Sequence, residues 1–443
     1  MLQAGHARLT LLSVLLVTGF CFADSNLPRV RPDQDAYMSG VRSLNSGDFT
    51  GAESRFHEAL TSGSKDVQLL SLFGLVNVEL HKGQPQEAEK YLRQAQATAP
   101  DEPSVYRAWG RYYAIQKKYT EAEQSFQKAV ALSHGDLSSE MDLGDFYSLG
   151  PHKFKEAAAE YRLVLAKKPD HAGAHFALGT ALTKLGQNAE AETELQQASR
   201  LAPTLPFAAE ALGELYLHRQ QYDKALDAFS ETVKREADFV PAHVGLGDAY
   251  WGKGDASMAA AEYTKAAKLA PNQASLQIKL AMMDEWFGKT QEAEQAYLAA
   301  IHLDPKADVA YNNLAWMTVG ENTHDSGKLD QAEKWAQQAV ALNPKNSAFQ
   351  VTLAWVYRAR GDLGNAGFTL EKAAAANPRS PEVLYRLGIV YSEAGKTAQA
   401  RTYLTKALAV DKNPGEADDI RKRLAAMGQG SAKQTASPAK AVH

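Results

Sequence analysis

The chain has 443 residues, of which 23% are charged and 45% are hydrophobic, an ordinary composition for a soluble protein. Because this length exceeds that of one compact core, we expect several domains or an array of repeats. The formal net charge of −4 and the pI of about 6.3 provide no basic field for a polyanion, which argues against binding of nucleic acid.

The first 23 residues have the layout of a secretory signal peptide. Arg8 precedes the apolar run LTLLSVLLVTGFCF, and Cys21 to Ala23 form a small-x-small cleavage site before Asp24. The run is short for a membrane-spanning helix, although an uncleaved anchor is the alternative. Phe20 stands where a lipoprotein signal has a small residue, which argues against lipidation of Cys21. We therefore expect an exported protein, periplasmic or secreted, with residues 24–32 as a short linker.

Cys21 is the only cysteine of the chain. If the signal is removed, the mature protein has no cysteine and forms no disulfide. An exported fold of this kind must be stabilised by packing alone.

Small residues recur from about residue 33 to residue 412 with a period of 34 residues or slightly more. The first series is Gly40, Gly74, Gly110, Gly144, Gly179, Gly213, Gly247, Ala281, Ala315, Ala354 and Gly388. The second series is Ala52, Ala88, Ala122, Ala157, Ala191, Ala225, Ala259, Ala293, Ala332, Ala366 and Ala400. Eleven units in register indicate an array in which each unit buries its apolar face against its neighbours.

Each unit is predicted to contain two helices. In residues 205–238, Leu212, Gly213 and Tyr216 share one face of the first helix, and the stretch YDKALDAFSETV has the pattern of the second. Prolines after the second helix begin the next unit, since proline does not continue a helix. Unit two has two extra residues before Ala88, and unit nine has five extra residues in TVGENTHDSG. We expect both insertions to lengthen the turns between helices.

These residues resemble the tetratricopeptide repeat, whose pattern is LG-x2-Y, then A-x3-F/Y, then A and P at a period of 34. The third unit matches well, with Gly110, Tyr113, Tyr119, Ala122, Phe126 and Ala129. The resemblance covers residues 33–412 and implies an all-α fold, a right-handed α-solenoid (superhelix) of about eleven helix-turn-helix repeats. Residues 413–427 are expected to form a capping helix, and residues 428–443 a disordered tail.

The candidates for catalysis or metal binding each have a plainer explanation. His171 and His175 have i, i+4 spacing but lack a third ligand. Gly247, Gly252 and Lys253 approach a phosphate-binding loop, but Gly254 stands where Ser or Thr is needed, and GKT at 288–290 lacks the first glycine. Adjacent carboxylates such as Asp284 and Glu285 are expected to be solvated. The sequence thus predicts no catalytic residue, no cofactor and no metal site, and favours a protein that is not an enzyme.

Four of the six tryptophans lie off the packed stripe of the first helices. We number each repeat so that the small residue of the first series is position 8, and positions 4, 7, 8 and 11 then form the packed face. In tetratricopeptide proteins the first helices line a concave groove, and positions 2, 5, 9, 12 and 13 usually meet the ligand. That resemblance predicts a partner-binding groove made of Trp251, Met282, Trp286, Asn312, Trp316, Val351, Trp355, Arg358 and Tyr385.

The alternative is that these tryptophans fill the inner wall of the superhelix. Arg107 and Arg111 lie on the first helix of unit three, but the asparagine partners of the carboxylate clamp used by chaperone-binding relatives are absent.

Two functions stay open on these grounds. One is a scaffold or adaptor that binds a protein or peptide in its groove during bacterial envelope assembly or secretion. The other is a polysaccharide-binding helper of glycan export or assembly, because tryptophans also stack on sugars. Contact with a membrane is expected only through an uncleaved signal anchor.

Overall fold

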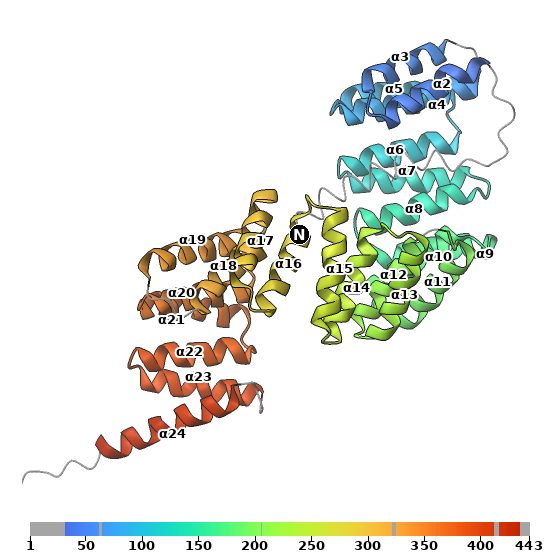
Figure 1. Cartoon of the computed structure of the whole chain (residues 1–443). Coiled ribbons are helices and arrows are strands. Elements are labelled where there is room, and N and C mark those ends of the chain that lie inside the picture. The colour runs from blue at the N-terminus through green and yellow to red at the C-terminus, as the bar shows by residue number, and fades with distance from the viewer. Residues whose placement is uncertain (1–31, 62–63, 205, 321–324, 412–415, 435–443) are drawn as a thin grey trace, which may run out of the picture. The chain divides into compact units, whose positions relative to one another are not determined.

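The computed structural model of the chain describes residues 32–61, 64–204, 206–320, 325–411 and 416–434. Within these ranges the protein consists of 23 helices joined by short turns, and contains no strands (Figure 1). The expected signal peptide and the linker to residue 31 lie outside the described residues. The chain divides into an N-terminal unit, residues 1–219, and a C-terminal unit, residues 220–443. Each unit is a stack of antiparallel helical hairpins, which is the solenoid architecture predicted from the period.

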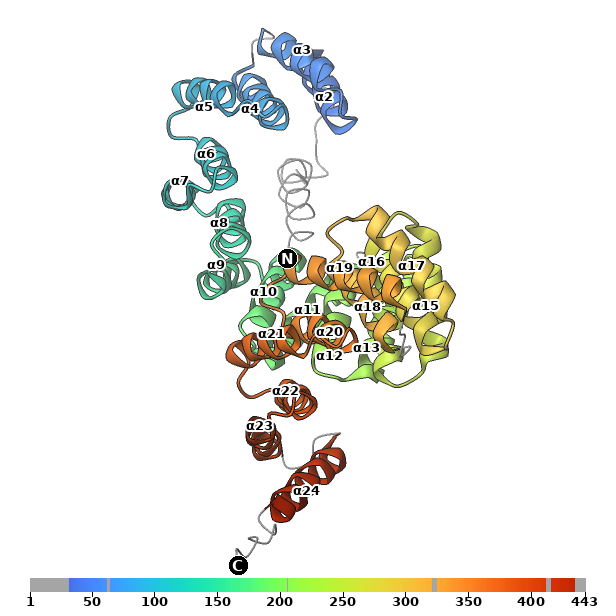
Figure 2. The same cartoon turned by 90° about the vertical axis from the view of Figure 1, so that its left-hand side faces the viewer.

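The described part of the N-terminal unit contains five helical hairpins followed by the first helix of a sixth repeat. Figure 2 views the hairpins α6–α7 and α8–α9 nearly end-on, as successive pairs. The helices are α2 (Pro32–Asn45), α3 (Phe49–Leu60), α4 (Lys65–His81), α5 (Pro85–Thr98), α6 (Pro103–Ile115), α7 (Tyr119–Leu132), α8 (Leu137–Leu149), α9 (Phe154–Lys167), α10 (Ala172–Lys184), α11 (Asn188–Leu201) and α12 (Phe207–His218).

The described part of the C-terminal unit begins with a second helix, continues through five hairpins and ends with a terminal helix. These helices are α13 (Tyr222–Arg235), α14 (Val240–Gly252), α15 (Ala256–Leu269), α16 (Ala274–Trp286), α17 (Thr290–Leu303), α18 (Asp308–Gly320), α19 (Ser326–Leu342), α20 (Ser347–Ala359), α21 (Leu363–Ala376), α22 (Pro381–Glu393), α23 (Thr397–Val410) and α24 (Ala417–Gln434).

The small residues of the period lie where the two helices of a hairpin touch. A Cβ atom added to Gly110 would lie 2.8 Å from the ring of Phe126, and one added to Gly247 would lie 2.4 Å from the ring of Tyr263. The second-helix alanines, such as Ala122, have no exposed surface. Because an aromatic ring of the second helix occupies the space of a missing side chain, the close approach of the two helices follows from the sequence.

In several repeats the tyrosine of the LG-x2-Y pattern connects the repeat to the one before it. The hydroxyl of Tyr147 on α8 donates to Glu123 of α7 at 3.0 Å, and Lys153 forms an ion pair with the same carboxylate at 2.9 Å. In the fifth and sixth repeats, Tyr216 of α12 donates to Glu192 of α11 at 2.9 Å. The phenol end of each ring thus finds a polar partner at the edge of the packed face.

The insertion in repeat two lengthens a helix, contrary to the expectation of a longer turn, whereas the insertion in repeat nine lengthens both the connection between its helices, as expected, and the second helix. Helix α4 has 17 residues and α6 has 13, whereas the turns that follow them, residues 82–84 and 116–118, are equally short. In repeat nine, α18 ends at Gly320 and α19 begins at Ser326, so five residues separate the two helices instead of three, and α19 itself has 17 residues. Asp325 caps the N-terminus of α19 by accepting hydrogen bonds from the backbone N–H groups of Gly327 and Lys328. Residues 321–324 of this insertion lie outside the described residues.

The terminal helix α24 covers the end of the array. Ile420 is fully buried against Leu384 of α22 and Leu404 of α23. The helix begins at Ala417 and extends past Met427 to Gln434, into the stretch expected to be a disordered tail. Among the helices described here, none combines the length and apolar composition that crossing a membrane requires.

Candidate functional site

Trp251 of α14 and Trp286 of α16 form an exposed aromatic pair. Their ring centroids lie 5.1 Å apart with an interplanar angle of 84°, the T-shaped geometry that aromatic quadrupoles favour. Trp286 is 64% exposed, Trp251 is 36% exposed, and Met282, one helical turn before Trp286, is 38% exposed. These three predicted groove residues therefore present an apolar surface to solvent on neighbouring first helices, and we call them the open aromatic patch.

Trp316 of α18 and Trp355 of α20 are covered by arginines of the same C-terminal unit. The guanidinium carbon of Arg386, on α22, lies 5.0 Å from the ring centroid of Trp316 and 4.3 Å from that of Trp355. Arg358 lies 4.9 Å from the ring of Trp355. Its guanidinium also forms an ion pair with Glu393 at 2.6 Å. We call these five residues the closed aromatic cluster, because protein cations already occupy its ring faces.

Asn312 and Asn313, in the segment YNNLAW of residues 311–316, belong to a chain of hydrogen bonds within the C-terminal unit. Asn312 donates to Asn313 at 3.1 Å, Asn313 donates to the hydroxyl of Tyr297 at 3.0 Å, and this hydroxyl donates to Glu285 at 3.1 Å. The Oδ1 atom of Asn312 is buried and has no donor within the described residues. The segment therefore fixes the hairpin α16–α17 to α18, and Trp316 lies one helical turn beyond Asn312.

Two residues assigned to the groove by repeat position have structural contacts. Val351 is 4% exposed and packs in the core with Val383 and Leu387, so the prediction that it faces the groove is wrong. Tyr385 is half-buried, and its hydroxyl donates to Asp419 of the terminal helix at 2.8 Å. At Val351 and Tyr385, position 5 is thus used for contact with the helix two further along the chain, α22 or α24.

Position 6 contributes residues that the analysis of repeat positions missed. Arg386 occupies this position in its repeat, and so does Lys279, which forms an ion pair with Asp248 of the preceding first helix. Asp142, at position 6 of the fourth repeat, pairs with Arg107 and Arg111 of the third repeat. A charged residue at position 6 is therefore the signal in the sequence that indicates these contacts between repeats.

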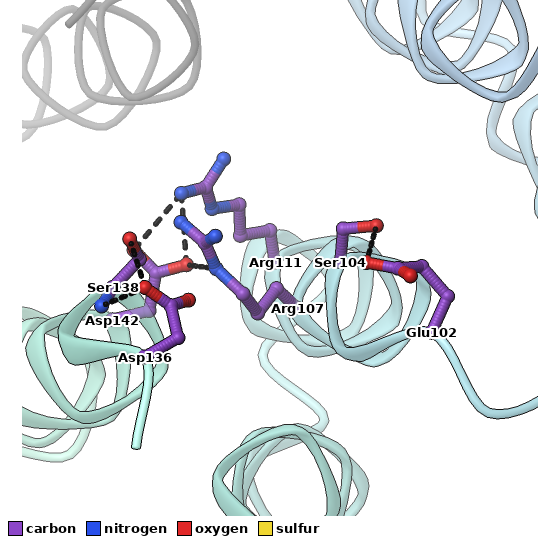
Figure 3. Close-up of polar contacts among 7 residues, drawn as sticks. All are labelled: Glu102, Ser104, Arg107, Arg111, Asp136, Ser138 and Asp142. Atoms are coloured by element: carbon purple, nitrogen blue, oxygen red, sulfur yellow. Dashed lines mark hydrogen bonds and ion pairs between the residues drawn. The ribbon is translucent and has the colours of Figure 1, made fainter. Parts of the chain in front are cut away.

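Arg107 and Arg111 of α6 converge on Asp142 of α8 in the N-terminal unit (Figure 3). The Nε atom of Arg107 lies 2.6 Å from Asp142, and Nη2 of Arg111 lies 2.9 Å from both oxygens of the same carboxylate. Burial by itself would raise the pKa of Asp142, but the charges of Arg111 and Arg107 outweigh it and hold the pKa below its usual value. One carboxylate thus binds two guanidinium groups.

Asp145 lies one helical turn beyond Asp142, and its pKa is shifted in the opposite direction. The hydroxyl of Tyr161 donates to Asp145 at 2.7 Å. Burial, together with the negative charge of Asp142, raises the pKa of Asp145 to about 6, although the hydrogen bond from Tyr161 opposes the shift. The folded state therefore binds the carboxyl proton of Asp145 more tightly than the unfolded state does. For this reason, ionisation of Asp145 destabilises the fold as the pH rises from about 4 to about 6.

Replacing Asp145 with asparagine is expected to stabilise the protein near neutral pH. Asparagine keeps an acceptor for Tyr161 without the charge. The free energy of unfolding at pH 7.5 should therefore rise by about 1–2 kcal/mol, which is less than the pKa shift alone implies because Asp145 is partly exposed to solvent. Urea unfolding at pH 7.5 and pH 5 measures the effect, which should be smaller at pH 5. Asp101→Asn, at an exposed turn, is the matched control, and an equal gain for both variants would contradict the assignment.

The two histidines with metal-ligand spacing are explained by structural contacts. The ring of His171 accepts a hydrogen bond from the backbone of Ala174 at the start of α10. The Nδ1 atom of His175 lies 2.6 Å from Glu194, and its Nε2 atom lies 2.9 Å from the carbonyl oxygen of Pro169. Within the ranges that the structure describes, no three His, Cys, Asp or Glu side chains gather as a metal site would require.

The glycines of the two near-matches to a phosphate loop belong to turns and helix contacts. Gly254 and Gly288 have φ angles of 83° and 71°, which non-glycine residues rarely adopt, and each lies in the tight turn of a hairpin. Gly247 packs against Tyr263. Glu285 accepts its hydrogen bond from Tyr297, and Asp284 lies 3.7 Å from Lys289.

The hairpin stack and its small-residue contacts define an all-α repeat protein. One sequence model described as tetratricopeptide repeat matches residues 148–215 and 357–424. A second model with this description matches residues 37–103, 73–136, 210–274 and 325–381, and together the matches cover more than half of the chain. The chain therefore belongs to the tetratricopeptide repeat family.

Similar proteins come from bacteria and eukaryotes. Cellulose synthase operon protein C of Xanthomonas axonopodis pv. citri is 26% identical over 328 residues, which are 72% of this chain and 19% of that protein. Anaphase-promoting complex subunit 3 of Schizosaccharomyces pombe is 22% identical over 66% of this chain and 43% of that protein. The chain thus spans about a fifth of the bacterial relative and less than half of the yeast one. The crystal structure of the APC/C hetero-tetramer Cut9-Hcn1 aligns over 93% of this chain and 98% of its own, with a TM-score of 0.49 and 16% identity.

Proposed function

We propose that this protein is a non-enzymatic scaffold that binds a protein partner through the first helices of its C-terminal unit, in bacterial envelope assembly or secretion. The open aromatic patch of Trp251, Met282 and Trp286 is the observation that carries the proposal. Large apolar side chains that stay exposed on neighbouring elements mark interaction surfaces, and tryptophan is enriched among residues that dominate binding energy. The groove that such first helices line in the family suits an extended segment of a partner.

The envelope part of the proposal depends on the sequence of residues 1–23. A charged residue before a short apolar run and a small-x-small site is typical of export. Fractionation of cells that produce the chain with a C-terminal tag would test it. Recovery of a shortened chain outside the cytoplasm supports export, whereas retention of the whole product in the cytoplasm removes this part of the proposal.

A polysaccharide ligand is the second candidate. Its support is the similarity to cellulose synthase operon protein C, a protein whose name places it with polymer synthesis, although only 19% of that relative is covered. Tryptophan faces also stack on sugar rings. A function as a helper of glycan export or assembly would use the same open aromatic patch.

Replacing Trp286 with alanine is expected to weaken partner capture about tenfold or more, since a central aromatic anchor contributes roughly 2 kcal/mol or more to binding. Capture from envelope extract by the native protein and the variant measures the loss. Phe368→Ala is the matched control, because Phe368 is 56% exposed but lies on the second helix α21.

Treatment of the captured material distinguishes the two candidates. A partner destroyed by protease supports the protein-binding scaffold, and one destroyed by glycosidase supports the polysaccharide helper. Equal capture by native protein and Trp286→Ala would place the binding surface outside the open aromatic patch and would contradict the proposal.

A further inference from the structure

Two buried tyrosines of second helices form the same contact in the fourth and seventh repeats. The hydroxyl of Tyr161 on α9 donates to Asp145 of α8 at 2.7 Å, and that of Tyr263 on α15 donates to Asp248 of α14 at 2.5 Å. Both aspartates stand at position 9 of their first helices. The two repeats thus contain the same tyrosine–carboxylate pair, built from the same repeat positions.

In the seventh repeat, the following repeat supplies a cation for this pair. Lys279, at position 6 of α16, forms an ion pair with Asp248. Its Nζ atom also lies 5.0 Å from the ring centroid of Tyr263. The ammonium group is therefore held by the carboxylate and by the face of the tyrosine ring, two interactions that both favour a positive charge.

Position 6 of a first helix contacts position 9 of the preceding first helix in three places in the array. The three pairs are Asp142 with Arg111, Lys279 with Asp248, and Arg386 with Trp355. In the fifth repeat, position 6 is Ala177 of α10, and α10 contacts α8, which carries Asp145. The equivalence of the repeats therefore assigns Ala177 to the place opposite Asp145 that Lys279 holds opposite Asp248.

Asp145 lacks the cation that its counterpart Asp248 has. Within the described residues, Asp145 accepts a hydrogen bond from Tyr161 and forms no ion pair. Burial raises the pKa of Asp145 to about 6, and the nearest cation, Arg111, does not compensate because it is paired with Asp142. Asp145 remains partly exposed, so its carboxylate is accessible from the surface of the first helices.

We infer that Asp145, Tyr161 and Ala177 form a site for the ammonium group of a lysine side chain of a polypeptide partner, and we call it the ammonium site. This inference goes beyond the proposed function, since the site lies in the N-terminal unit and uses no residue of the open aromatic patch. The lysine takes the place that Lys279 holds opposite Asp248. Lysine suits the site because alanine at position 6 leaves the volume beyond Cβ free, and a long flexible stem carries the ammonium to a partly buried carboxylate.

The test is a titration of the purified protein at pH 7.5 with N-acetyl-lysine amide, followed through alanine methyl signals in NMR spectra. N-acetyl-6-hydroxynorleucine amide, which has a neutral hydroxyl in place of the ammonium, is the matched probe. The lysine probe should shift the signal of Ala177, which Ala177→Ser identifies by its loss. The hydroxyl probe should require a roughly tenfold higher concentration. Asp145→Asn keeps an acceptor for Tyr161 and should abolish this difference between the probes.

The affinity for the lysine probe should fall as the pH falls. The probe is charged at both pH 7.5 and pH 5, whereas only about a tenth of Asp145 is ionised at pH 5, since its pKa is about 6. Asp142, whose pKa lies below its usual value, and Arg111 keep their charges in this range. We therefore expect an apparent affinity about tenfold weaker at pH 5, and an unchanged affinity would overturn the inference.

Two substitutions test the assigned geometry. Ala177→Lys supplies an ammonium from within the chain, so it should raise the midpoint of thermal unfolding at pH 7.5 by about 2 °C in the native background and not in Asp145→Asn. Lys279→Ala removes the internal cation of the seventh repeat, and its new alanine methyl signal should respond to the lysine probe. Circular dichroism confirms that both variants are folded.

Three results would overturn the inference: a silent Ala177 signal, equal responses to the two probes, or an equal thermal effect of Ala177→Lys with and without Asp145. A stronger response to glucosamine than to the lysine probe would assign the site to an amino sugar and would also overturn it. These results are distinct from the test of the proposed function. If Trp286→Ala loses its partner while the Ala177 signal is silent, the scaffold proposal stands and the lysine inference fails.

Discussion

Replacing Tyr297 with alanine is expected to lower the free energy of unfolding of the surrounding repeats by about 3–5 kcal/mol. The ring of Tyr297 is fully buried between α16, α17 and α18, and its removal leaves a cavity in the core. The change also removes the hydroxyl that connects Asn313 to Glu285. Because repeat arrays can open locally, hydrogen–deuterium exchange of α16 to α18 is the most direct measurement, with urea unfolding beside it.

Tyr297→Phe is the control that separates packing from hydrogen bonding. It keeps the ring and removes only the hydroxyl, so it should lower the free energy of unfolding by about 1 kcal/mol. If the amide hydrogens of α16 to α18 exchanged at the same rate in the Tyr297→Ala and Tyr297→Phe variants, packing of the Tyr297 ring would not be the source of the stability. The difference between them should also appear as slower exchange in α16 for the phenylalanine variant.

Replacing Asp142 with asparagine is expected to destabilise the N-terminal unit by about 3 kcal/mol. The change leaves Arg107 and Arg111 beside each other without a counter-charge, and both side chains are largely buried. Thermal unfolding, together with hydrogen–deuterium exchange of α6 and α8, measures this loss of stability. Arg107→Gln is the control, since it keeps the contact of Arg111 with Asp142 and should be milder.

The pH dependence of Asp142 provides an independent check. Its pKa is lower in the folded state than in the unfolded state, so its contribution to stability is fully present above the unfolded value. The contribution is lost as the pH falls through the folded value. Unfolding of Asp142→Asn should therefore depend less on pH in the acid range than unfolding of the native protein, and an unchanged acid profile would contradict the assignment.

The helical hairpins could be predicted because their determinants are local and repeated. Gly110 and Phe126 lie within one repeat, and their contact recurs with each period, so the sequence pattern records the packing directly. The insertions were harder to place. A count of residues between Gly74 and Ala88 does not reveal whether extra residues lengthen a helix or a turn, and continued helical hydrogen bonding decides for the helix.

The candidate site could be predicted only in part. Directions on a single helix placed Trp251, Met282 and Trp286 on a solvent-facing surface, where the structure has them. The same directions could not reveal that Arg386 covers Trp316 and Trp355, because Arg386 lies two repeats beyond Trp316 and one repeat beyond Trp355. Val351 was misplaced for the same reason, since the following first helix brings Val383 and Leu387 against it.

The contact between Tyr385 and Asp419 has a consequence for engineering. Tyr385 of α22 reaches past α23 to Asp419 of α24, much as Arg107 of α6 reaches Asp142 of α8. The terminal helix therefore docks through the kind of interface that one repeat offers to another. A designer could insert or delete whole repeats ahead of α24 and keep the same ending, so the reach of the binding surface and the termination of the array are separable modules.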